Sequence, residues 1–248
     1  PMGGPSSLPA HFLRSMMSPD KIEKQIVRSG LAAVLRTCII SITYCPWQSP
    51  EGDSYTHDLI ARCSWQHPML LLDHWGKPVF TFLASPFAQF GLKGIMVFNL
   101  ICTIASSWFA YQIALLTGLR KAWTTPVYLV FATLTFQVVF SGLTEPLFAL
   151  FLISGVYFWM KDRATTAFLV ISFLPFVRSE GLLFIGLFGL AGLYRKKFFL
   201  LPFLGCGHII LALAGWLVGK DFLWIFTEIP YANLNSQYGF ICSDKFHT

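Results

Sequence analysis

Long apolar runs alternate with short polar breaks along the chain, and only one polar segment, residues 48–92, is long. Four uninterrupted or nearly uninterrupted apolar runs follow that segment: residues 94–119, 122–160, 164–194 and 198–219. A helix needs about 20 apolar residues to cross a bilayer. The pattern therefore predicts an all-α, polytopic membrane protein.

Two of these runs carry charged residues at their centre. Glu145 interrupts the run over residues 122–160, with glycine and proline nearby, and Arg178-Ser179-Glu180 interrupts the run over residues 164–194. Glycine and proline favour a turn at such a point. We expect each run to form a hairpin of two helices, which gives about seven transmembrane helices. The count includes a first span over residues 29–47, which Arg36 interrupts.

Composition agrees with a membrane protein. Hydrophobic residues make up 55% of the chain, charged residues only 12%, and the mean hydropathy is +0.60. Soluble domains carry about 25% charged residues. The low charge content thus excludes an ordinary soluble domain.

The distribution of charge predicts an orientation. With the N-terminus inside, the inner segments hold eleven Lys and Arg and three Asp and Glu, whereas the outer segments hold six and nine. Basic residues favour the cytoplasmic side. We expect an integral multi-pass protein of a bacterial inner membrane with a cytoplasmic N-terminus. The net charge of +6 follows from this bias and does not indicate binding to nucleic acid.

The same pattern predicts the domain organisation. Residues 1–28 are rich in Pro, Gly and Ser and are expected to be a flexible cytoplasmic segment. The expected parts that follow are a transmembrane domain over residues 29–219, its outer loop 48–92 and an outer tail over residues 220–248. Within the outer loop, interfacial helices are expected between residues 55 and 91.

The outer loop carries candidate catalytic chemistry. Asp53 and His57 are four residues apart and share a face if the segment is helical, and Asp58 follows directly. A carboxylate there could act as a general base that removes a proton from an attacking hydroxyl group. Gly-Asp-Ser before a helix is also good capping chemistry, so both interpretations of Asp53 stay open.

Metal binding and disulfide bonding are less specific signals in this loop. His57, Asp58, His67, Asp73 and His74 are suitable ligand types without diagnostic spacing, so a divalent metal is left open and no cofactor is assigned. Cys63 and Cys242 could meet outside the membrane as a disulfide.

Several charged residues are expected at the same outer face. Lys77, in Trp75-Gly76-Lys77-Pro78, suits a phosphate at headgroup level, although interfacial Trp and Lys are also ordinary anchors. Glu145 could simply be a solvated charge at a turn, and Arg178 with Glu180 could be an ion pair that marks a helix end. Their convergence on one face favours a site lined by carboxylates and cations.

Over residues 50–195 the sequence resembles the GT-C membrane glycosyltransferases. The features that carry the resemblance are an acidic residue opening the outer loop, Asp-His-Trp-Gly-Lys-Pro over residues 73–78, Leu-Thr-Glu-Pro-Leu-Phe around Glu145 and Phe-Val-Arg-Ser-Glu-Gly around Arg178. The pattern is most similar to the protein O-mannosyltransferase and lipid A aminoarabinose transferase group.

This resemblance implies inverting transfer of a sugar from a polyprenyl-phosphate donor to an acceptor at the outer, periplasmic or lumenal face. It implies that Asp53 is the base and that Lys77 and Arg178 hold the lipid phosphate. The further expected substrate-binding residues are His57, Asp58, His74, Glu145 and Glu180. Ser54 stands where the group has a second carboxylate, and members of the group have more spans, which suggests an incomplete member.

Two other classes compete with this interpretation. A multi-pass transporter would place ionisable residues at mid-membrane depth on broken helices. A truncated, inactive membrane scaffold would need none of the site residues.

Overall fold

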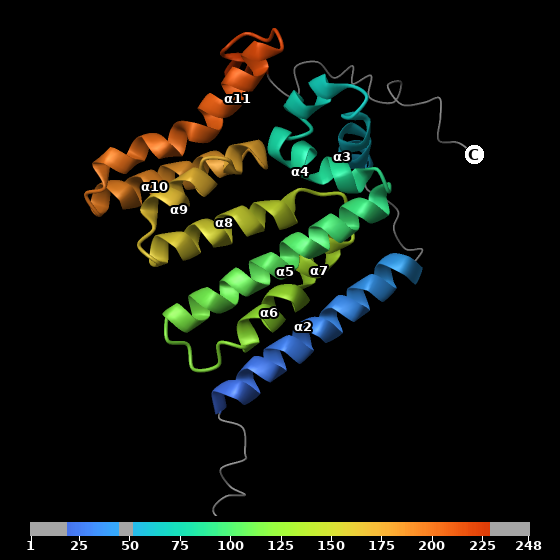
Figure 1. Cartoon of the computed structure of the whole chain (residues 1–248), viewed down its shortest axis with the longest axis vertical. Coiled ribbons are helices and arrows are strands. Elements are labelled where there is room, and N and C mark those ends of the chain that lie inside the picture. The colour runs from blue at the N-terminus through green and yellow to red at the C-terminus, as the bar shows by residue number, and fades with distance from the viewer. Residues whose placement is uncertain (1–18, 45–51, 229–248) are drawn as a thin grey trace, which may run out of the picture.

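The computed structural model describes residues 19–44 and 52–228, and every regular element in this part of the chain is a helix (Figure 1). This confirms the all-α prediction for the described residues. The elements are α2 (Pro19–Tyr44), α3 (Gly52–Cys63), η1 (Pro68–Leu72), α4 (Pro78–Ala88), α5 (Leu92–Leu116), α6 (Thr124–Phe131), α7 (Thr133–Val139), α8 (Glu145–Met160), α9 (Ala164–Ile171), η2 (Leu174–Phe176), α10 (Gly181–Tyr194), η3 (Phe198–Gly205), α11 (Cys206–Leu217) and α12 (Trp224–Thr227).

Helix α5 is the central element. It packs against α8 on one side and against α2 and α6 on another, and α8 packs in turn on α9. The short helices α3 and α4 pack near the first residues of α5 (Figure 1). A buried cluster that includes Phe80, Ile95, Leu147 and Val177 joins α4, α5, α8 and the segment after η2. Burial of this apolar surface brings the start of α8 and the segment before α10 close to α3 and α4.

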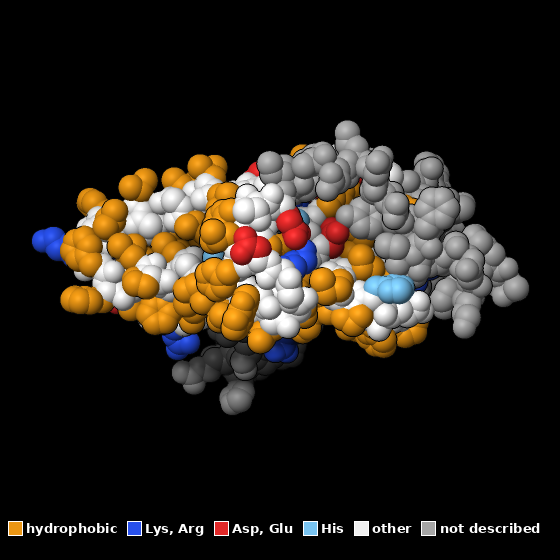
Figure 2. All heavy atoms as spheres, turned by 90° about the horizontal axis from the view of Figure 1, so that it is seen from above, with side chains coloured by type: hydrophobic (Ala, Val, Ile, Leu, Met, Phe, Trp, Pro, Cys, Tyr) orange, Lys and Arg blue, Asp and Glu red, His pale blue; other side chains and the backbone are white. Residues whose placement is uncertain are grey.

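Two described helices are long and apolar enough to cross a membrane, residues 92–116 and 198–217. The apolar window of the first is 61% buried inside the protein, as in a core helix, whereas that of the second is only 22% buried. Figure 2 shows hydrophobic side chains over much of the visible face. The structure thus supports two candidate spans among the described residues. The larger number, about seven, rests on the sequence pattern alone and stays a prediction.

The helices are broken at both positions where a turn was expected. Residues 140–144 separate α7 from α8, and residues 177–180 separate η2 from α10. An additional break was not predicted: residues 124–139 form two short helices that meet at Ala132, whose φ and ψ are −58° and 128°. No proline or glycine marks this position, so the sequence pattern carried no signal for it.

The first helix begins earlier than expected. Residues 19–28, which the sequence pattern assigns to the flexible segment, belong to α2. The rest of the predicted flexible segment and residues 229–248 of the predicted tail lie outside the described residues.

A buried asparagine holds the turn before α8. Asn99 of α5 is fully buried, and its Nδ2 donates hydrogen bonds to the carbonyl oxygens of Ser141 at 2.9 Å and Leu143 at 3.1 Å. Gly142 lies between these two residues and packs against the backbone of Ser54, in the first turn of α3. This turn therefore fixes the start of α8 against the start of α3.

Replacement of Gly142 by alanine should separate these two segments. The new Cβ atom would lie 2.4 Å from the carbonyl oxygen of Ser54, so the backbone must shift. We expect Gly142→Ala to lower the free energy of unfolding by roughly 1–3 kcal/mol, measured by thermal unfolding in detergent micelles. Gly186→Ala is the matched control, because no atom lies within 4 Å of its added Cβ. Equal melting temperatures for both variants would contradict the packing described here.

Candidate functional site

One polar cavity of about 560 Å³ collects charged residues from four separate segments of the chain. Its lining residues are Asp53, His57, Trp75, Lys77, Leu143, Thr144, Glu145, Arg178, Ser179 and Glu180. Figure 2 shows acidic and basic side chains gathered near the middle of a largely hydrophobic face. Six of the eight site residues predicted from the sequence, Asp53, His57, Lys77, Glu145, Arg178 and Glu180, thus line a single cavity.

Arg178 is the charged centre of this cavity. Its Nη1 contacts Glu145 Oε1, and its Nη2 donates to Glu180 Oε1 at 2.9 Å. The hydrogen bonds that Arg178 donates to Glu180 raise the pKa of Arg178, and the same bonds lower the pKa of Glu180. The group is therefore permanently positive, with one carboxylate partner from α8 and another from the residue before α10.

Lys77 enters the cavity from a strained position. It precedes Pro78, the first residue of α4, and its φ of 62° is unusual for a residue with a side chain. The Asp73 carboxylate stabilises this turn by accepting a hydrogen bond from the Gly76 N–H at 2.6 Å. Lys77 Nζ donates to Ser179 Oγ at 3.0 Å. Burial lowers the pKa of Lys77, with the Glu180 carboxylate acting against this effect. Strained residues of this kind concentrate at binding sites.

Asp53 and His57 lie one turn apart on α3 and both line the cavity. The His57 ring stacks on Trp75 with 4.7 Å between ring centroids and meets the edge of Phe80 at 5.4 Å. Burial lowers the pKa of His57 to about 4, although the nearby Asp53 carboxylate opposes the shift. The imidazole is therefore neutral at pH 7. Asp53 is exposed in the first turn, so its carboxylate is accessible from the cavity.

Two predicted substrate-binding residues do not line the cavity. Asp58 is 1% exposed and forms an ion pair with Arg62, one turn further along α3. A rotation of about 100° per helical residue turns Asp58 away from the face that carries Asp53 and His57. His74 also lies elsewhere, with Nδ1 2.6 Å from the carbonyl oxygen of Glu228.

The five residues considered as metal ligands are not brought together. Among residues 19–44 and 52–228, no group of three or more His, Cys, Asp or Glu side chains is placed to hold a metal ion. Cys63 is disulfide-bonded, and Cys242, the partner expected from the sequence, lies outside the described residues.

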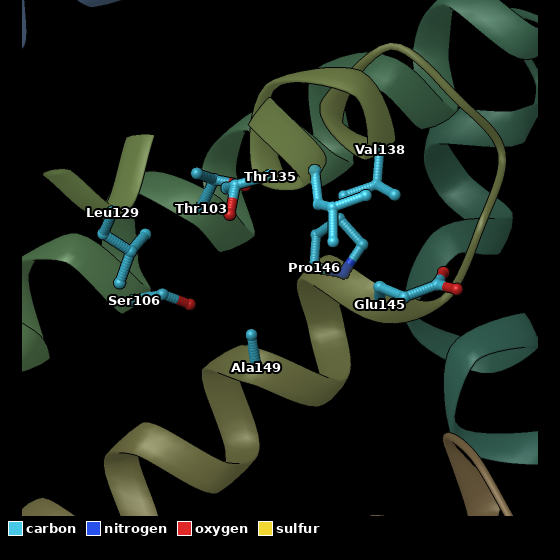
Figure 3. Close-up of a pocket in the computed structure, with 9 residues that line it drawn as sticks. Thr103, Ser106, Leu129, Thr135, Val138, Glu145, Pro146 and Ala149 are labelled. Carbon is cyan, nitrogen blue, oxygen red and sulfur yellow. The ribbon is translucent and has the colours of Figure 1, made fainter. Parts of the chain in front are cut away.

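An apolar cavity of about 390 Å³ lies next to the polar one and shares Glu145 with it. Figure 3 shows side chains from α5, α6, α7 and α8 around this space, with the Glu145 carboxylate at its edge and directed away from it. The lining residues are Thr103, Ser106, Leu129, Leu134, Thr135, Val138, Glu145, Pro146 and Ala149. The start of α8 is therefore the wall between a charged cavity and an apolar one.

Sequence reasoning missed several residues that shape the polar cavity. Ser179 and Thr144 line it, and Asn99 positions the turn that carries Glu145. Trp75 was not predicted as a site residue, whereas it stacks on His57. The polar Asn99 within an apolar helix was the one available signal, since a buried amide needs a partner.

No family model, curated protein or solved structure matches the chain. A functional conclusion must therefore come from the residues and geometry of the two cavities.

The buried His57 should make stability depend on pH. Its pKa of about 4 in the folded state is below its value of 6.5 in the unfolded chain, so the unfolded state binds more protons between these values. The free energy of unfolding should fall by about 2 kcal/mol as the pH falls from 7.5 to 5. Thermal unfolding across this range measures the loss.

The variant His57→Phe serves as the comparison, because phenylalanine keeps an aromatic ring against Trp75 and cannot be protonated. Between pH 7.5 and 5, we expect the free energy of unfolding of His57→Phe to fall by about 2 kcal/mol less than that of the wild-type protein. All other titrating groups are shared, so the difference between the two proteins isolates His57. Parallel pH profiles would contradict a buried, neutral imidazole.

Proposed function

We propose that this protein is a membrane glycosyltransferase that uses a polyprenyl-phosphate-linked sugar as its donor. The observation that carries the proposal is the polar cavity, in which a carboxylate, Asp53, and two cations, Lys77 and Arg178, come from distant parts of the chain. A base for the acceptor and cations for a phosphate leaving group are what this reaction needs. The resemblance over residues 50–195 assigns the same three roles.

The proposal includes a multi-pass topology of about seven spans. In support, the breaks that carry Glu145 and Arg178 line one cavity together with α3. At the other ends of the same helices, the turn after α8 and the turn after α10 are joined by an ion pair between Asp162 and Lys197. Large apolar side chains such as Leu190 and Trp216 are exposed, which suits a lipid environment.

The proposed reaction assigns one task to each group. The Asp53 carboxylate accepts the proton of the acceptor hydroxyl, whose oxygen attacks the anomeric carbon of the sugar. The bond between that carbon and the phosphate oxygen breaks, and its electron pair leaves with the lipid phosphate. Lys77 and Arg178 stabilise the negative charge that develops on the phosphate. Attack opposite to the leaving group inverts the anomeric configuration.

The apolar cavity suits the lipid part of such a donor. It meets the polar cavity at Glu145, so a phosphate near Arg178 and an apolar chain among Leu129, Val138 and Pro146 could belong to one molecule. Burial of isoprenoid methyl and methylene groups against these side chains is favourable.

The placement of charge favours a transferase over a transporter. Every ionisable residue that lines the polar cavity lies on α3, before α4, or at the start of α8 and α10, rather than in the middle of α5 or α11. Transporters place such groups near the middle of their spans.

The deciding experiment measures sugar transfer from a polyprenyl-phosphate-linked sugar by the protein in detergent micelles or vesicles. Asp53→Asn keeps the size of the side chain and removes the basic oxygen. We expect transfer to fall by roughly 10²–10⁴-fold, with the melting temperature unchanged because Asp53 is exposed.

Asp58→Asn is the matched control on the same helix. It should lower the melting temperature, because it weakens the ion pair with the partly buried Arg62, while transfer by the folded fraction persists. Normal transfer by Asp53→Asn together with loss in Asp58→Asn would move the role of base to Asp58. Absence of transfer by the wild-type protein from every such donor would reject the proposed function.

A further inference from the structure

Arg178 is occupied on two sides before any ligand arrives. Glu145 contacts Nη1, and Glu180 contacts both Nη2, at 2.9 Å, and Nε, at 3.4 Å. A guanidinium binds a phosphate through paired N–H groups. A phosphate that uses the Nε and Nη2 edge of Arg178 must therefore displace Glu180.

The two carboxylates differ in how firmly they are held. Glu145 begins α8 directly before Pro146, and its Oε2 is buried without a hydrogen-bond partner among the described residues. Its side chain is 37% exposed, whereas the Glu180 side chain is 58% exposed. Glu145 is thus the more enclosed partner, and Glu180 is the partner that solvent or a ligand can reach more easily.

Glu180 lies at the N-terminal end of its own helix. It occupies the N-cap position of α10, but its carboxylate makes no capping hydrogen bond there and contacts Arg178 instead. The N-terminal end of a helix attracts negative charge. The side chain can therefore move off Arg178 and remain in a favourable field.

Glu180 also acts on the second cation of the cavity. Its carboxylate counteracts the lowering of the Lys77 pKa by burial, and Lys77 contributes to the lowered pKa of Glu180. Lys77 itself is hydrogen-bonded to Ser179, the residue between Arg178 and Glu180. One carboxylate therefore lies in the field of both phosphate-binding cations.

We infer that Glu180 is a specificity-determining residue that competes with the ligand phosphate for Arg178 and discriminates against phosphates of higher charge. This inference rests on the proposed function. A sugar-linked phosphodiester carries one negative charge, whereas the phosphomonoester left after transfer carries up to two. Repulsion by Glu180 is about twice as large for the doubly charged group. Glu180 thus weakens product binding more than donor binding and favours release of the lipid phosphate.

The test compares two probes that differ in charge, farnesyl phosphate and its methyl diester. Their dissociation constants are measured at pH 7.5 by titration calorimetry on the full chain in detergent micelles. We expect Glu180→Gln to tighten binding of the monoester about tenfold and of the diester about threefold. Inorganic phosphate, added as a competitor, separates headgroup binding from insertion of the farnesyl chain into micelles.

Two further variants show whether the effect comes from the charge of Glu180. Glu180→Ala removes the same charge without the amide and should shift both constants in the same direction. Asp162→Asn changes the net charge equally at an exposed ion pair with Lys197, and should leave both constants unchanged.

Unchanged or weaker binding of both probes in the two Glu180 variants would overturn the inference, because Glu180 would then only hold Arg178 in place. An equal increase in affinity for both probes would show that Glu180 does not discriminate by charge, which also overturns the inference. If no protein binds either probe saturably, the proposed phosphate site fails and this inference fails with it. Binding by all proteins, without response to Glu180, leaves the proposed function intact and rejects this inference alone.

Discussion

The contact between Arg178 and Glu145 is the interaction on which the candidate site depends. It joins two breaks in apolar helices that are 33 residues apart in the chain. Arg178 is only partly exposed, so its charge needs nearby carboxylates to offset the loss of hydration. The pair therefore places a permanent positive charge in the polar cavity, next to Glu145, the residue that this cavity shares with the apolar one.

The rest of the site is assembled around this pair by neutral contacts. Asn99 fixes the turn before Glu145, and Gly142 allows that turn to touch the first turn of α3, which carries Asp53. Ser179, beside Arg178, accepts a hydrogen bond from Lys77. Packing and hydrogen bonds to uncharged partners thereby help to hold the charged groups close to one another.

The balance of charge in the cavity bears on its chemistry. Asp53, Glu145 and Glu180 together exceed Lys77 and Arg178 by one negative charge, with His57 neutral. Such a cavity does not attract every anion. An anion that binds Arg178 must compete with the carboxylates of Glu145 and Glu180, so its binding would depend on its geometry and charge rather than on a general positive field.

Much of the site could be predicted from the sequence because its chemistry departs from an apolar background. A charge inside a long apolar run is costly unless it has a function or a partner, so Glu145, Arg178 and Glu180 stood out. The break positions followed for the same reason. The face of α3 that carries Asp53 and His57 could also be predicted, since residues four apart share a face.

Only the tertiary structure decided which charged residues meet. Asp58 has the same chemistry as Asp53, but the packing of α3 buries Asp58 away from the cavity, on the face that carries its local partner Arg62. His74 pairs with the backbone of Glu228, a partner 154 residues away that no local pattern indicates. The sequence by itself determined the helical class and the positions of the charges, because these follow from local hydrophobic and polar spacing. The pairing of those charges depends on how the helices pack, which is set by contacts between residues far apart in the chain.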